Sequence, residues 1–103
     1  MHIEGVIAVL GGLEERELLS WVERGWVRPD ASGNLWEFRE IDVARARLIR
    51  ELRHDMDVSD EAMPVVLSLL DQIYDLRRAL RRLTTALDRQ PPELRAAVLE
   101  AMG

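Results

Sequence analysis

The sequence contains no cysteine, no lysine and only two histidines. Without cysteine there is neither a disulfide framework nor thiolate chemistry, which fits a reducing compartment. His2 and His54 lie far apart in the sequence and cannot supply the ligand cluster of a metal site, so we expect no metal and no cofactor. No pair of titratable groups stands at a known catalytic spacing. The sequence therefore predicts a protein that is not an enzyme.

Long apolar runs are also absent. The N-terminal run of residues 6–10 follows no basic residue and is too short for a signal-peptide core or a membrane span, which makes the cytoplasm the default location. All 14 cationic side chains are arginine, which we attribute to coding bias because nothing physical forbids lysine on a solvated surface. The formal net charge of −5 argues against a nucleic-acid partner and for a basic one.

The stretch GGLEERELLSWVERGWVRP, residues 11–29, has the rhythm of a helix-turn-helix. A short first helix with Gly5 at its N-cap ends at Gly11-Gly12, and a second helix runs from about Glu14 to Gly25. The apolar positions of the second helix share one side at helical spacing; they are Leu18, Leu19, Trp21 and Val22. Its first turn is acidic, with Glu14, Glu15 and Glu17. These carboxylates either cap the helix, whose dipole favours anions there, or form a binding surface.

A β-hairpin wing is predicted after the second helix. Residues 26–28 are expected to form one strand, the turn-rich residues 29–34 the tip, and residues 35–38 the other strand. Because isolated hairpins are marginally stable, we expect the three tryptophans to pack on the helices. A third helix is predicted for residues 41–54. Its arginines are expected to form a solvated face beside nearby acidic residues; they are Arg45, Arg47, Arg50 and Arg53.

The last predicted helix is the longest, with Ser59 as its cap and Pro64 within its first turn and a half. Its apolar residues repeat at alternating spacings of four and three, which is a heptad pattern. They are Ala62, Val66, Leu69, Ile73, Leu76, Leu80, Leu83 and Leu87. No other predicted helix is long enough to cover this apolar seam, so we expect a homodimer held by residues 69–87. β-branched residues at the a positions favour a parallel coil.

The tail after Pro91-Pro92 is expected to form one more short helix or to fray. The predicted organisation is therefore a mainly α protein with three segments. Residues 1–57 form a winged helix-turn-helix domain, residues 58–90 a coiled-coil dimerisation helix, and residues 91–103 the tail.

Four segments resemble the CbpM branch of MerR-like regulators. EERELLSWVERG resembles its Glu-rich second helix, and ERGWVRP the passage from helix to wing. LWEF is similar to its Trp-x-Phe wing strand. The segment RLIRELRHDMDVSDEAMPVVLSLLDQIYDLR resembles its third helix, linker and coil. Together they cover roughly residues 3–88.

The resemblance implies a chaperone modulator. Members of that branch are homodimers that bind the J-domain of a co-chaperone of the DnaJ or CbpA class and block its stimulation of DnaK. The J-domain presents a strongly basic helix, so the resemblance implies that the acidic second helix binds it through complementary charge. It also implies a MerR-like fold, whose coil is antiparallel. From charge alone, the expected partner-binding residues are Glu14, Glu15, Glu17, Glu37 and Asp42.

Two alternatives compete with this interpretation. A MerR-like DNA-binding transcriptional regulator needs cations that reach phosphates from the second helix and the wing. Acidic residues outnumber arginines between Glu14 and Phe38, however, and the wing tip at residues 30–34 has no cation. In a purely structural dimerisation module, the acidic helix would be incidental.

Overall fold

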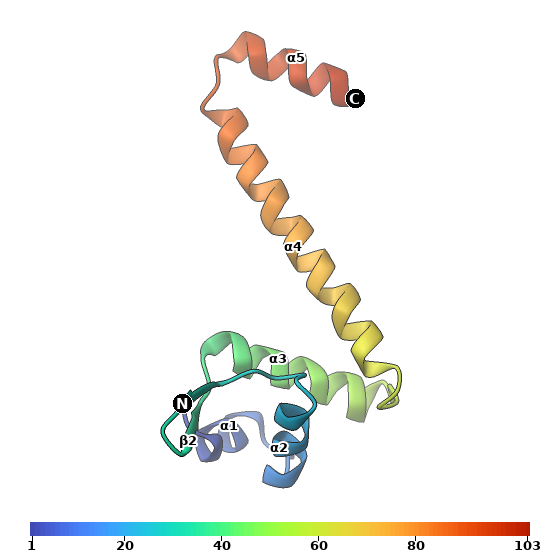
Figure 1. Cartoon of the computed structure of the whole chain (residues 1–103). Coiled ribbons are helices and arrows are strands. Elements are labelled where there is room, and N and C mark those ends of the chain that lie inside the picture. Colours follow the sequence, from blue (N-terminus) through green and yellow to red (C-terminus); the bar gives the residue numbers. More distant parts are fainter. The chain divides into compact units, whose positions relative to one another are not determined.

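Eight elements follow one another along residues 1–103, all of which the computed structural model describes (Figure 1). They divide between two units, Met1–Pro64 and Val65–Gly103, which are described here one at a time. The first unit contains α1 (Ile3–Leu10), α2 (Glu15–Glu23), β1 (Asp30–Ser32), β2 (Leu35–Glu37), α3 (Glu40–Arg50) and the π-helical segment η1 (Glu51–Asp55). The helix α4 (Met63–Asp88) begins at the end of the first unit and makes up the second together with α5 (Pro92–Met102). The fold is mainly α, a winged helix-turn-helix with a two-stranded wing and a long helix after it.

Every helix of the first unit contributes at least one side chain to its core, and so do the residues just before and just after the wing. Its buried apolar residues are Val6, Leu10, Leu13, Leu18, Trp21, Trp26, Val27, Phe38, Ala46, Ile49, Leu52 and Met63. Two of the three tryptophans are buried, as expected, but Trp36 on the wing is 39% exposed. The expectation that all three tryptophans pack on the helices is therefore wrong for Trp36.

The helices α1 and α2 end at the glycines that the sequence predicts. Gly11 and Gly25 have φ angles of 66° and 76°, which residues with a side chain rarely adopt. The N-terminal boundary of α1 differs from the prediction, because the helix begins at Ile3 with His2 as its N-cap. Gly5 therefore lies inside the first turn.

The wing begins later than the sequence indicated. Residues 26–28 do not form a strand, because the backbone N–H groups of Trp26 and Val27 donate to the carbonyl of Trp21 and close the end of α2. The first strand is β1, which pairs antiparallel with β2 so that Ala31 lies opposite Trp36. The turn between them contains only Gly33 and Asn34, and Gly33 has a φ of 62°.

Three of the four arginines that the sequence predicts as a solvated face make internal contacts instead, and only Arg47 is exposed. Arg45 donates to the carbonyl of Trp26, and Arg50 donates to the carbonyls of Leu10 and Gly11. These guanidinium groups thus satisfy backbone acceptors at the ends of α1 and α2. Arg53 donates to the carbonyl of Val58 and forms an ion pair of 3.2 Å with Asp60.

The long helix α4 begins one residue after Ala62, so Ala62 is not part of the helical seam. The hydroxyl of Ser59 accepts a hydrogen bond from the N–H of Ala62, and Pro64 is the second residue of the helix. Five seam side chains are between 45% and 65% exposed; they are Leu69, Ile73, Leu76, Leu80 and Leu83. The tail forms a helix, α5, rather than fraying.

Candidate partner-binding face

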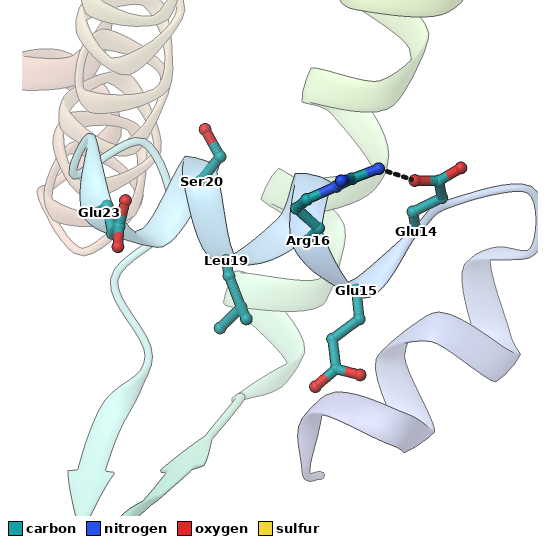
Figure 2. Close-up of a pocket in the computed structure, with 6 residues that line it drawn as sticks. All are labelled: Glu14, Glu15, Arg16, Leu19, Ser20 and Glu23. Carbon is teal, nitrogen blue, oxygen red and sulfur yellow. Dashed lines mark hydrogen bonds and ion pairs between the residues drawn. The ribbon is translucent and has the colours of Figure 1, made fainter.

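One side of α2 is exposed and combines carboxylates with an apolar side chain. Glu15, Leu19 and Glu23 are spaced four residues apart and line a surface depression together with Glu14, Arg16 and Ser20 (Figure 2). In Figure 2, Glu15 and Leu19 point to the same side of the helix. We call Glu14, Glu15, Leu19 and Glu23 the acidic α2 face.

Leu19 does not belong to the core, contrary to the sequence prediction. It is 37% exposed, whereas its neighbour Leu18 is fully buried. The two residues are about 100° apart around the helix, so Leu19 can lie outside the core although its neighbour Leu18 lies inside it. Leu19 therefore places an accessible apolar group between the carboxylates of Glu15 and Glu23.

Glu14 precedes the first residue of α2 and carries a nearby counter-charge. Its Oε2 lies 3.4 Å from a terminal nitrogen of Arg16. Both side chains are largely in water, at 74% and 90% exposure, so this ion pair contributes little stability. Glu14 therefore remains available to form an ion pair with a cationic side chain of a partner.

Glu17 faces another side of α2. Its Oε1 lies 2.5 Å from Nε2 of His54, which belongs to η1, and its side chain is only 30% exposed. This contact joins α2 to the end of the third helical segment. Glu17 is therefore separate from the acidic α2 face, although it follows Glu15 by only two residues.

The two other predicted site residues hold internal contacts. The ammonium group of Met1 lies 2.5 Å from Glu37 Oε1, and this hydrogen bond holds the pKa of Glu37 below its ordinary value of 4.5. Asp42 is 4% exposed and accepts hydrogen bonds from the backbone N–H and the guanidinium of Arg39. These bonds cap α3 and raise the pKa of Arg39. Asp42 has no free oxygen to offer a partner, and we leave it out of the binding face.

Glu23 was absent from the predicted site residues, yet it lines the depression with Glu15 and Leu19. The spacing of these three residues at i, i+4 and i+8 was the signal that would have found it. The sequence prediction misses this signal because it places Leu19 on the buried side of the helix.

Most cations of the first unit are held by internal contacts. Arg24 forms an ion pair with Asp60 and lies 5.1 Å from the centre of the Trp26 ring, and Arg28 donates to the carbonyl of Gly25. Arg39, Arg45, Arg50 and Arg53 bind carboxylates or carbonyls as described above. An arginine held in this way must give up its partner before it can bind a phosphate group, which reduces any gain from counterion release.

Two helices followed by a two-stranded wing and a third helix define the chain as a winged helix-turn-helix protein. A family model described as MerR HTH family regulatory protein matches residues 5–85. The chain belongs to this family, whose members are in general regulators rather than enzymes. No curated protein and no solved structure matches the chain. None of its helices has both the length and the apolar character required to cross a lipid bilayer.

Proposed function

We propose that the protein is a chaperone modulator of the CbpM branch. It binds the basic helix of a J-domain from a DnaJ- or CbpA-class co-chaperone through the acidic α2 face, and it thereby blocks stimulation of DnaK. The observation that carries the proposal is the composition of α2. This is the helix that a winged helix-turn-helix presents to its ligand, and here it exposes Glu15 and Glu23 on either side of Leu19, with Glu14 at its N-cap.

The charges favour a basic protein helix over a phosphate backbone. Three carboxylates outweigh the roughly half positive charge that the helix dipole places at the N-terminus of α2. Each rim carboxylate contributes under about 1 kcal/mol and acts mainly on the association rate. Leu19 adds an apolar contact that simple charge attraction lacks. A basic helix that also carries an apolar residue matches both features.

The proposal includes a homodimer formed through α4. The seam residues Leu69, Ile73, Leu76, Leu80, Leu83 and Leu87 lie at heptad spacing. All but Leu87 are at least 45% exposed in the single chain. A second copy offers the same stripe and the same length, which is the self-complementary surface that a symmetric dimer requires. Both the parallel and the antiparallel arrangement satisfy this pattern.

ATP hydrolysis by DnaK tests the proposal. We expect the wild-type protein to suppress hydrolysis that a J-protein stimulates. The variant Glu14→Arg/Glu15→Arg/Glu23→Arg should lose this suppression, because it presents cations to a basic helix. The matched control Glu51→Arg/Glu61→Arg/Glu100→Arg makes the same charge change at exposed positions outside the face, and it should suppress as wild type does. Equal suppression by both variants would show that the acidic α2 face is not the binding site.

The competing function, a DNA-binding regulator, is in keeping with the description of the matched family. It requires free cations on α2 and the wing. The wing tip has none, and α2 carries a single arginine, Arg16, which is 90% exposed and stands among the carboxylates of that helix. Apart from Arg16 and Arg47, the arginines of the first unit hold the internal partners given above. We therefore prefer the protein partner.

A further inference from the structure

The C-terminal half of α4 carries arginines that hold no internal partner. Residues 76–90 contain five arginines and a single acidic residue, Asp88. Arg81, Arg82 and Arg89 are exposed and form neither a hydrogen bond nor an ion pair within the chain. Most arginines of the first unit, in contrast, bind carbonyls or carboxylates of that unit. The guanidinium groups of α4 therefore have all their N–H donors available to a ligand.

These arginines lie on the side of α4 that faces away from the heptad seam. With Leu80 at position a of its heptad, Arg81 and Arg82 take positions b and c. Arg78 and Arg89 take positions f and c of the neighbouring heptads. Positions b, c and f lie on the outside of a two-stranded coil, whether its helices are parallel or antiparallel. The arginines are therefore accessible in the single chain and in either dimer.

A shallow depression separates some of these guanidinium groups. Arg81, Arg82 and Arg89 line it together with the small side chains of Thr85 and Ala86. The hydroxyl of Thr85 has no hydrogen-bond partner within the chain. Three guanidinium groups and one hydroxyl thus surround a space without bulky side chains. Guanidinium groups bind carboxylates and phosphates through short, charge-assisted hydrogen bonds.

An aromatic side chain lies at the N-terminal end of the same side of α4. Tyr74 is 50% exposed, and the guanidinium carbon of Arg78 lies 5.9 Å from the centre of its ring. A cation–π contact at an exposed site is weak, so both side chains remain available to a partner. Tyrosine and arginine are enriched among the residues that contribute most to protein–protein binding. We define the basic α4 face as Tyr74, Arg78, Arg81, Arg82 and Arg89.

The extent of the basic α4 face favours a short ligand over a long polyanion. Arg78 and Arg89 lie about 16 Å apart along the helix axis, at ~1.5 Å per residue. Asp75 precedes the face, Asp88 lies at its end and Glu93 follows it. A nucleic-acid strand that extends beyond the face meets these carboxylates, although its affinity depends on the number of phosphates that cations neutralise. A segment with a few carboxylates needs only the arginines of the face.

We propose that the basic α4 face binds a short acidic segment of a partner protein, whose carboxylates extend over about 16 Å. The carboxylates pair with Arg81, Arg82 and Arg89, and the hydroxyl of Thr85 donates one further hydrogen bond. An apolar side chain of the segment contacts Tyr74. This surface is separate from the acidic α2 face, and its ligand has the opposite charge. The proposal therefore does not depend on binding of a J-domain.

Fluorescence anisotropy with the full-length protein tests the proposal. The probe is a labelled peptide that contains four glutamates and one leucine, and the comparison is a labelled deoxythymidine strand of the same length. We expect micromolar affinity for the peptide at low salt and weaker binding of the strand. Arg82→Glu/Arg89→Glu should weaken peptide binding at least tenfold. The control Arg16→Glu/Arg47→Glu makes the same charge change at exposed positions of the first unit and should bind within twofold of wild type.

The neutral variant Arg82→Gln/Arg89→Gln removes the two cations without adding repulsion, and it should weaken peptide binding at least threefold. Wild-type affinity in this variant would overturn the proposal, and so would equal losses in the charge-reversal variant and its control. Absence of peptide binding at millimolar peptide would also contradict it. Tighter binding of the deoxythymidine strand than of the peptide would overturn the acidic segment in favour of a nucleic acid.

Discussion

The substitution Leu80→Glu tests the dimer at the middle of the seam. Leu80 is 59% exposed in the single chain, so a second copy can still bury more than half of its side chain. Full burial of a leucine contributes roughly 1.5–3 kcal/mol, which leaves about 1–2 kcal/mol per copy at this position. A glutamate in the same dry seam costs several kcal/mol more, because its charge loses water and gains no partner.

Both copies carry the change, so the dimer should lose at least ~4 kcal/mol, or about a thousandfold in its dissociation constant. This holds for either orientation of the coil, since the new charge meets a seam position in both. Analytical ultracentrifugation at micromolar concentration should show a monomer. The matched control Thr85→Glu adds the same charge to an exposed position outside the seam and should remain dimeric. A Leu80→Glu protein that sediments at dimer mass would refute the argument.

Three further outcomes are expected. Asp42→Ala should lower the free energy of unfolding by about 1–2 kcal/mol in urea titrations, because it removes the cap of α3 and the partner of Arg39; unchanged stability would contradict that role. Glu17→Gln should leave J-domain affinity within twofold by calorimetry, since Glu17 contacts His54, and a tenfold loss would return it to the binding face. Selection from random duplexes at physiological salt should enrich no site; a sequence bound with sub-micromolar affinity would favour the DNA-binding alternative.

The local signals of the sequence predicted the order of the elements well. Glycines with positive φ end α1 and α2 where expected, and the heptad residues from Val66 to Leu87 lie within a single helix. The errors arose where a backbone group found a non-local or unusual partner. The N–H groups of Trp26 and Val27 bond to Trp21 instead of a neighbouring strand. The segment η1 adds a π-helical turn, with the N–H of Met56 bonded to the carbonyl of Glu51, that hydrophobic periodicity does not reveal.

The candidate site was harder to predict because the charge of a side chain does not show whether an internal contact already occupies it. Charge alone predicts one binding surface made of five acidic residues. In the structure, Glu14 and Glu15 are exposed. Asp42 caps α3, Glu17 contacts His54, and Glu37 pairs with the ammonium group of Met1. A single sequence cannot reveal the contacts of Glu17 and Glu37, since their partners lie 37 and 36 positions away, whereas the partner of Asp42 is only three residues away.

The position of the J-domain contact is the central claim, and an NMR titration tests it most directly. Unlabelled J-domain should be added to the ¹⁵N-labelled protein while amide shifts are followed residue by residue. We expect the largest changes at Glu15, Leu19 and Glu23, with the amides of Asp30 to Asn34 at the wing tip unaffected. Shifts confined to the wing or to α3, or no shifts at millimolar J-domain, would contradict binding through the acidic α2 face.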